Sequence, residues 1–423
     1  MQIKAASPWR WVPTLYFAQA VPYVIAMTVS VVMYKTLGIS NTDIALYTSW
    51  LYLPWVIKPL WSPLVEMFAT KRIWILGMQL AIGTSLALVA LTLPVAHFFQ
   101  VSLAVLWLLA FASATHDIAA DGFYMLALEQ HQQAAFVGVR SAFFRVGMIS
   151  AQGGLVYLAG ALGDFTGNVG AAWSIVFVVA GGMFALLCGW HRLVLPVPPA
   201  DHSVEHDDFL RAFASSFASF FRRKRIASIL AFLLLFRFAE AQALKLVTPF
   251  LLDPRDAGGL GLSTEEVGIV YGTIGVLALT AGGLLGGVVI SRDGLRRWLW
   301  PMVIAMHVPN LVFVYLALAQ PSSIVAICVA LAIEQFGYGF GFAAFLLFMV
   351  MVSDGPTRTA HYAICTGFMA LGMMLPGMAS GWLEERLGYA NFFIWVCFAT
   401  IPSFIVAALI HVDPDFGRKP RPA

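Results

Sequence analysis

The sequence is poor in charged residues. Asp, Glu, Lys and Arg make up 11% of its 423 residues, whereas 60% are hydrophobic and the mean hydropathy is +0.82. Because soluble domains carry about 25% charged residues, a soluble protein of this size could not hide so much apolar surface. The chain is therefore predicted to be an all-α polytopic membrane protein. Its N-terminal segment leads directly into an apolar run long enough to span a bilayer, so we expect no cleaved signal peptide.

Cysteine and the common catalytic motifs are also scarce. The four cysteines lie inside apolar runs without CxxC spacing, which predicts neither disulfides nor a metal site. The sequence lacks a GxxxxGK phosphate loop, HExxH and GxSxG. An ATP-driven pump is thereby disfavoured, and a membrane-embedded enzyme would rest on the dipeptide His116–Asp117 alone. We expect no enzyme activity, no catalytic residue, no metal and no cofactor.

Long apolar runs dominate what is present. A spanning helix needs about 20 apolar residues, and twelve such runs can be read between polar, Gly or Pro breaks. The first six lie near 10–35, 41–66, 70–95, 100–128, 134–162 and 170–195, and the second six near 226–252, 264–291, 296–319, 322–352, 358–387 and 390–412. The predicted organisation is a six-helix half (1–195), a linker (196–225), a second six-helix half (226–412) and a tail (413–423).

Basic residues predict the orientation. With a cytoplasmic N-terminus, seventeen Lys and Arg residues lie in inner loops and three in outer loops. The positive-inside rule then places both termini and the linker in the cytoplasm. Five phenylalanines at helical spacing precede the basic run 222–225, which predicts an amphipathic linker helix on anionic lipid. They are Phe209, Phe213, Phe217, Phe220 and Phe221. The bilayer is thus an expected partner, and nucleic acid is not.

Two loops at matching places in the halves look like diverged copies. The loop after the eighth span reads GGVVISRDGLRRWLWP, and the loop after the second span, PLWSPLVEMFATKRIW, has acidic and basic residues in similar order. The first of these resembles the signature loop of the major facilitator superfamily, whose pseudo-symmetric halves are related by an axis along the membrane normal. This resemblance implies a twelve-helix carrier rather than a channel. It marks a gating loop made of Arg292, Asp293, Arg296 and Arg297.

Within that superfamily the chain resembles the AmpG-type muropeptide permeases. The similar segments are VIKPLWSPLVE (Val56–Glu66), HDIAADGF (His116–Phe123), FRVGMISAQGG (Phe144–Gly154), FRFAEAQA (Phe236–Ala243), STEEVGIVYGTIG (Ser263–Gly275), EQFGYGFGFAAF (Glu334–Phe345) and GMASGWLEERLGYANFF (Gly377–Phe393). The resemblance implies a monomer that imports an anhydro-muropeptide together with protons by alternating access. Two positions depart from the family pattern: His116 replaces a glutamine, and Lys245 adds a cation. Acetyl-CoA carriers and siderophore importers share the K-x-x-W-S/A-P and D-x-x-x-D-G patterns, so a carrier of another bulky anion is the alternative.

Charged residues inside spans are costly and mark functional or paired sites. In the first half, Asp117 and Asp121 share one helix face and repel each other, so one of them is a candidate proton acceptor. The depth of the other charges in this half predicts that they meet the two acids as charge partners. These are Lys58, Arg140 and Arg145. The alternative is a charge cluster that only braces helix ends.

In the second half, Glu240 and Glu334 lie near the bilayer midplane, where carriers of this kind hold substrate. Both are candidate proton-coupling groups, and Gly337, Gly339 and Gly341 would leave a cavity beside Glu334. The alternative is a structural ion pair such as Arg237–Glu334. The candidate substrate-binding residues are Tyr16, Gln19 and Tyr23 on one face of the first span, with Arg145, Gln152, Arg237, Gln242, Lys245 and Glu334.

Overall fold

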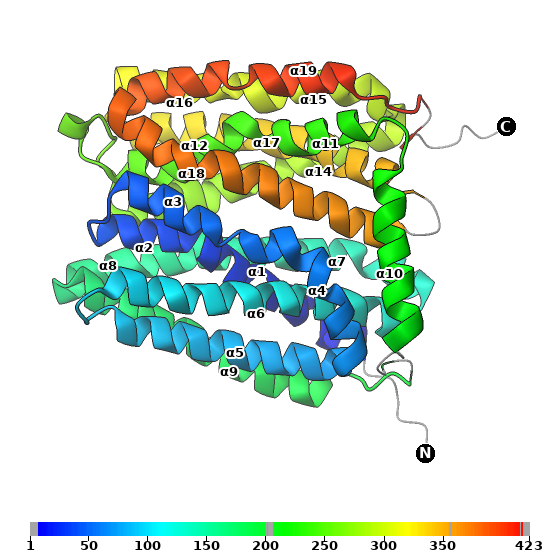
Figure 1. Cartoon of the computed structure of the whole chain (residues 1–423). Coiled ribbons are helices and arrows are strands. Elements are labelled where there is room, and N and C mark those ends of the chain that lie inside the picture. The colour runs from blue at the N-terminus through cyan, green and yellow to red at the C-terminus, as the bar shows by residue number, and fades with distance from the viewer. Residues whose placement is uncertain (1–6, 200, 202–205, 355–357, 415, 418–423) are drawn as a thin grey trace. The chain divides into compact units, whose positions relative to one another are not determined.

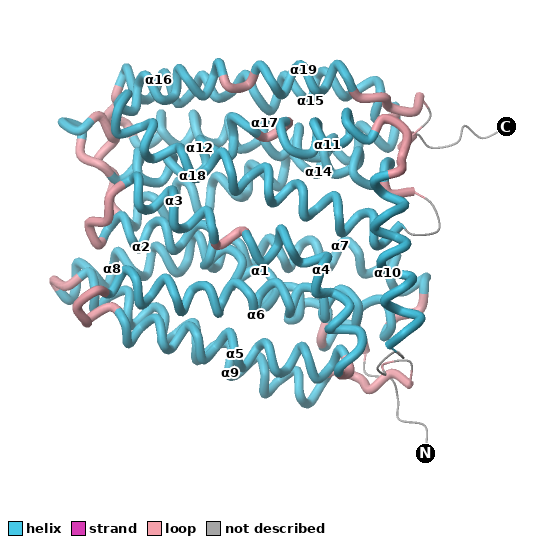
Figure 2. The backbone as a smooth tube through the Cα atoms, in the orientation of Figure 1, coloured by secondary structure: helices cyan, strands magenta, loops and turns pink. Residues whose placement is uncertain are grey.

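The computed structural model describes residues 7–199, 201, 206–354, 358–414 and 416–417. Most of the predicted tail, including its basic residues at 418, 419 and 421, and the predicted cytoplasmic Lys4 lie outside the described residues. Within the described ranges every regular element is helical, and short loops join the helices (Figure 2). The all-α prediction is confirmed.

Ten helices in the described part of the chain are long and apolar enough to cross a membrane. Nine correspond to single predicted spans, Pro8–Thr36 being the first of them. The second predicted span is divided into α3 (Asn41–Trp50) and α4 (Leu53–Phe68) by a turn at Leu51 and Tyr52. The last two predicted spans run together over Ala360–Leu409, with a change of direction at Gly388, where φ is +71°. The twelve predicted runs therefore appear as ten continuous helices and one divided span.

The chain forms two compact units. The first contains Met1–Leu37 and Ile57–Ala212, and the second contains Gly38–Val56 and Phe213–Ala423. The helix α3, which belongs to the second predicted span, thus packs with the second unit. It lies against α12 (Phe238–Leu252) and α18 (Arg358–Phe398). Gly381 permits this approach, because a Cβ there would lie 2.0 Å from the carbonyl oxygen of Asn41.

Polar contacts hold α3 on the second unit. The amide nitrogen of Asn41 donates to Glu384 Oε2 (2.7 Å) and to the Tyr389 hydroxyl (2.9 Å), which in turn donates to Asp253. Asn41 and Glu384 are buried, so these hydrogen bonds satisfy polar groups that packing removes from solvent.

Besides most of α4, the first unit contains seven described α-helices, and Figure 1 shows its helices packed side by side. Within it α5 packs against both α6 and α9. Gly83 and Gly181 face each other there, and a Cβ on Gly181 would come within 2.9 Å of the Gly83 carbonyl oxygen. The helices are α1 (Val12–Val24), α2 (Ser30–Thr36), α5 (Lys71–Thr92), α6 (Phe98–Ala127), α7 (Gln130–Met148), α8 (Val156–Thr166) and α9 (Val169–Val194), with π-helical turns at Ile25–Val29 and Ile149–Leu155.

The second unit adds a longer set of helices to α3, α12 and α18. They are α11 (Ile226–Leu235), α13 (Thr264–Val267), the π-helical turn Gly268–Gly275, α14 (Val276–Asp293), α15 (Leu295–His307), α16 (Leu311–Ala319), α17 (Ile324–Val352) and α19 (Ile401–Leu409).

The cavity expected beside Glu334 is not formed by the glycines of α17. A Cβ on Gly339 would lie 2.0 Å from the Leu279 carbonyl oxygen, and one on Gly337 would lie 2.1 Å from that of Ala305. Neighbouring helices fill the face that the missing side chains leave open.

The predicted linker helix is α10 (His206–Phe221). Phe220 is fully buried and packs edge-on against His361, and the ring of Phe221 packs on Phe368. His361 is also hydrogen-bonded by Ser219 and Arg223, both at 2.8 Å. The end of the helix therefore covers the start of α18, and the expectation that its phenylalanine face lies on lipid is wrong for Phe220. The side chains of Phe209 and Phe213 lie outside the described residues.

Candidate functional site

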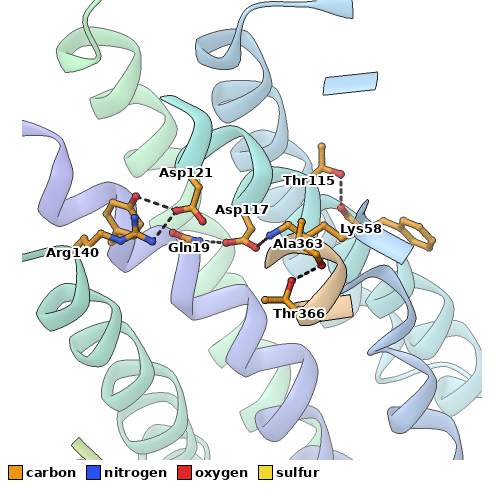
Figure 3. Close-up of polar contacts among 10 residues, drawn as sticks. Gln19, Lys58, Thr115, Asp117, Asp121, Arg140, Ala363 and Thr366 are labelled. Atoms are coloured by element: carbon orange, nitrogen blue, oxygen red, sulfur yellow. Dashed lines mark hydrogen bonds and ion pairs between the residues drawn. The ribbon is translucent and has the colours of Figure 1, made fainter. Parts of the chain in front are cut away.

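The first unit brings Asp117 together with two donors from other helices. Lys58 of α4 donates to Asp117 Oδ2, and Gln19 of α1 donates to Asp117 Oδ1 (Figure 3). The side chains of Lys58 and Asp117 are each 19% exposed. Asp117 is therefore both ion-paired and hydrogen-bonded, and the contact joins three helices.

Asp121 has a separate set of partners. Its Oδ1 accepts from the Tyr16 hydroxyl at 3.1 Å and from an Arg140 guanidinium nitrogen at 3.2 Å. The guanidinium also lies over the rings of Tyr16 (4.5 Å) and Tyr124 (5.3 Å), which adds cation–π attraction. Four of the five charges expected to meet form two neighbouring ion pairs. Arg145 donates to the Met148 sulfur at 3.4 Å.

This arrangement gives Asp117 and Asp121 a cation each. Such pairing compensates the repulsion between Asp117 and Asp121 and ties α1, α4, α6 and α7 together. It also occupies two of the expected substrate-binding groups, because Tyr16 and Gln19 donate to the acids. Tyr16 and Gln19, at i, i+3 on α1, each face one acid of the i, i+4 pair Asp117 and Asp121 on α6, and sequence reasoning missed this correspondence. Tyr23 and Gln152 are half-buried.

His116 belongs to a different polar chain from its neighbour Asp117. Gln79 lies 3.0 Å from His116 Nε2 through its amide nitrogen and 3.0 Å from His191 Nδ1 through its amide oxygen. His191 Nε2 in turn lies 2.9 Å from the Thr14 hydroxyl. Gln79, His116 and His191 are fully buried. Sequence reasoning missed Gln79 and His191, although each is a polar residue inside an apolar run.

The second unit contains the two predicted midplane acids. An Arg237 nitrogen lies 3.6 Å from Glu240 Oε1, and the same guanidinium donates to the Tyr338 hydroxyl. The expected alternative pair, Arg237 with Glu334, is replaced by this i, i+3 pair. Glu334 is 5% exposed, and its Oε2 accepts from the Gln335 amide at 2.8 Å. Among the described residues, no Lys, Arg or His nitrogen lies within 4.0 Å of the Glu334 carboxylate.

Lys245 on α12 is, like Glu334, a buried charged side chain, but its charge is positive. It is 4% exposed, its ammonium donates to Thr48 Oγ1 at 2.9 Å, and it lies 5.3 Å from the centre of the Tyr52 ring. No carboxylate oxygen of the described chain lies within 4.0 Å of it. Gln242, one turn earlier on α12, is hydrogen-bonded through both its amide atoms: its oxygen accepts from Trp395 (2.9 Å) and its nitrogen donates to the Phe238 carbonyl (3.1 Å).

The predicted gating loop ends α14 and starts α15. Asp293 accepts from the Trp298 indole at 3.0 Å and lies 3.7 Å from Arg297 and 3.9 Å from Arg292. The two arginines are mostly exposed, so these are weak surface pairs, and Arg296 is exposed as well. The loop brings an acid and two of its three bases together at the end of a helix.

Nothing in the described part of the chain resembles a metal centre. No group of three or more His, Cys, Asp and Glu side chains is placed there to hold a metal ion. Cys188, Cys328, Cys365 and Cys397 are free thiols, and each is at least partly buried.

Comparison with known proteins gives matches over most of the chain. Residues 14–255 match the model of the Major Facilitator Superfamily. The anhydromuropeptide permease of Escherichia coli (strain K12) is 25% identical over 398 residues, which cover 93% of this chain and 76% of that protein. The putative transporter AmpG 4 of Rickettsia felis is 26% identical over 397 residues, 90% and 92% of the two chains. The solved nucleoside transporter NupG shares the fold at 17% identity, with a TM-score of 0.70 over 94% and 98% of the chains.

Proposed function

Because this chain belongs to the Major Facilitator Superfamily, we propose that it is a proton-coupled importer of anhydro-muropeptides that works by alternating access. The fold and the relatives are those of multi-pass secondary transporters, which agrees with the expectation that the chain is no enzyme. Similarity to AmpG-type permeases over nine-tenths of the chain supports the substrate. A bacterial inner membrane, cytoplasmic termini and a monomeric state complete the proposal.

One observation carries the proton coupling: Glu334 is buried without a cation. An isolated ionised carboxylate is far more costly to bury than a protonated one. A transported proton would remove this cost at Glu334, whereas Asp117, Asp121 and Glu240 each already face a cation. We therefore assign the coupling proton to Glu334, with Glu240 as a neighbouring acid held by Arg237. The Asp117 and Asp121 pairs serve as braces between helices.

Uptake into proteoliposomes tests this function. Purified protein is expected to accumulate labelled anhydro-muropeptide only when the pH gradient is directed inward. Glu334→Gln should abolish accumulation driven by the gradient and retain exchange of labelled for unlabelled substrate. Asp164→Asn, at an exposed site on α8, is the matched control and should behave as the wild type.

The outcomes separate the parts of the proposal. Equal uptake by the wild type with and without a gradient would refute proton coupling. Gradient-driven accumulation by Glu334→Gln would refute only the assignment to Glu334 and direct attention to Glu240. Transport of acetyl-CoA or a siderophore in place of muropeptide would establish the alternative substrate class.

A further inference from the structure

Lys245 and the neighbouring Ser49 have more hydrogen-bond donors than acceptors among the described residues. An ammonium carries three N–H donors, and the only described acceptor of Lys245 is Thr48 Oγ1. That hydroxyl donates to the Ile44 carbonyl at 2.6 Å, so it accepts from the lysine. The neighbouring Ser49 hydroxyl is fully buried and has no hydrogen-bond partner among the described residues. Several donors and a positive charge therefore meet without a compensating anion.

The backbone of α18 approaches the same place closely. A Cβ on Gly377 would lie 2.9 Å from Ser49 Oγ and 3.4 Å from Lys245 Cγ. The glycine thus lets α18 pack directly against both the serine hydroxyl and the lysine stem. Tyr52, in the turn between α3 and α4, presents its ring face to the ammonium, which stabilises a cation there. All these residues belong to the second unit.

From this geometry we infer that Lys245, with Thr48, Ser49 and Tyr52, forms a subsite for an anionic group of the transported molecule. The group accepts hydrogen bonds from the ammonium and from Ser49, as a carboxylate or a phosphate does. The subsite deepens the proposed function and rests on it, because the acidic part of a glycopeptide is the anion that it would hold. A buried unpaired cation is costly, and bound substrate would supply the missing charge.

The subsite and Glu334 lie in one region of the second unit. Leu246, which follows Lys245 on α12, and Leu331, one turn before Glu334 on α17, belong to one buried apolar cluster that also contains Tyr271. Two opposite charges in this region are therefore unpaired, and they lie too far apart to pair with each other. A proton at Glu334 and an anionic group at Lys245 would compensate both. The filled site would then hold one proton for each anionic group that it binds.

Binding to the purified full-length protein, without a pH gradient, tests the subsite. The probes are an anhydro-muropeptide, the same molecule with its carboxylates converted to amides, and acetyl-CoA as a phosphate-bearing ligand. The wild type should bind the free acid about 10- to 100-fold more tightly than the amide, the contribution expected of a charged hydrogen bond. Lys245→Met should remove this preference and leave the affinity for the amide unchanged. Lys224→Met, at an exposed site, is the control and should retain the preference.

Thermal stability of the empty protein gives a second readout. If Lys245 served only to hold α12 on α3 through Thr48, Lys245→Met would lower the unfolding temperature. A ligand-binding lysine predicts an unchanged or higher temperature, because the substitution removes an uncompensated charge.

Five results separate the fate of the subsite from that of the proposed function. A wild type that binds acid and amide equally, or that binds neither acidic ligand, would overturn the subsite. A Lys245→Met protein that loses affinity for both forms alike would also overturn it. Lysine-dependent binding of acetyl-CoA alone would support a phosphate subsite and refute the muropeptide substrate. Gradient-independent uptake with intact acid selectivity would refute proton coupling and leave the subsite standing.

Discussion

The pair Lys58–Asp117 allows a quantitative test of the brace in the first unit. Lys58→Met removes the cation and keeps a side chain of similar length, which leaves the Asp117 carboxylate with the Gln19 amide alone. Breaking a fully buried ion pair costs about 3–5 kcal/mol, whereas exposed pairs contribute about 0–1 kcal/mol. With both side chains 19% exposed and one hydrogen bond retained, we expect a loss of about 2 kcal/mol, which is about 30-fold in the unfolding equilibrium.

A double-mutant cycle isolates the interaction from other effects of each substitution. Asp117→Asn leaves the ammonium without its carboxylate and should cost a similar amount. The double variant Lys58→Met/Asp117→Asn should be more stable than the sum of the two losses predicts, by about 2 kcal/mol. Denaturant unfolding of the detergent-solubilised protein, followed by circular dichroism, measures the four free energies. Arg10→Met, at an exposed site, should change stability by less than about 0.5 kcal/mol.

Two results would refute this reasoning. Additive losses in the double variant would mean that the two groups do not stabilise each other across the helices. Loss of proton-driven uptake in Asp117→Asn, with unfolding and substrate binding unchanged, would show that the carboxylate takes part in transport rather than in bracing.

Two other substitutions test packing in the two units. Gly339→Ala should lower the unfolding free energy by about 1–3 kcal/mol, because its Cβ would lie 2.0 Å from the Leu279 carbonyl oxygen and force α14 away from α17. The control is Gly287→Ala on α14, which has no neighbour within 4 Å and should cause no loss of stability. Equal effects of the two substitutions would contradict the close contact at Gly339. Gln79→Leu should cost about 2–4 kcal/mol, because His116 and His191 would each lose a buried hydrogen bond. Leu80→Ala, at a 60% exposed site, is its control, and unchanged stability of Gln79→Leu would show that the histidines find other partners.

The sequence was sufficient to predict the helical architecture, because spanning length is read directly from apolar runs. It also predicted which charges of the first half meet, since helical rise gives the depth of each residue. Lys58, Asp117, Asp121 and Arg140 lie at similar depth and do pair. Depth does not determine which cation faces which acid, and the pairing of Lys58 with Asp117 and of Arg140 with Asp121 required the structure.

Other features depend on how helices face each other, which a single sequence does not contain. The i, i+3 spacing of Arg237 and Glu240 is visible in the sequence, and the structure pairs these two residues. The predicted depths in the membrane were equally compatible with a pair between Arg237 and Glu334. The glycines after Glu334 could have lined a cavity or a helix contact, and only the positions of the Leu279 and Ala305 carbonyls distinguish these cases. For the same reason the sequence could not predict that α3 packs on α18.

The paired acids Asp117 and Asp121 of the first unit differ from the unpaired Glu334 and Lys245 of the second, and this difference separates bracing from binding. In the first unit Asp117 and Asp121 each have a cation, so neutralising one partner leaves a buried charge unpaired and should destabilise the fold. In the second unit Glu334 and Lys245 have no oppositely charged partner in the described chain, so Glu334→Gln and Lys245→Met remove an existing cost and should maintain or raise stability. Unpaired buried charges do not stabilise a protein. The simplest reason to keep them is that a compensating charge binds during transport, as a proton at Glu334 and an anionic group at Lys245. Unfolding measurements on these variants therefore distinguish structural charges from transport charges before any substrate is known, and a loss of stability in Glu334→Gln or Lys245→Met would contradict the assignment.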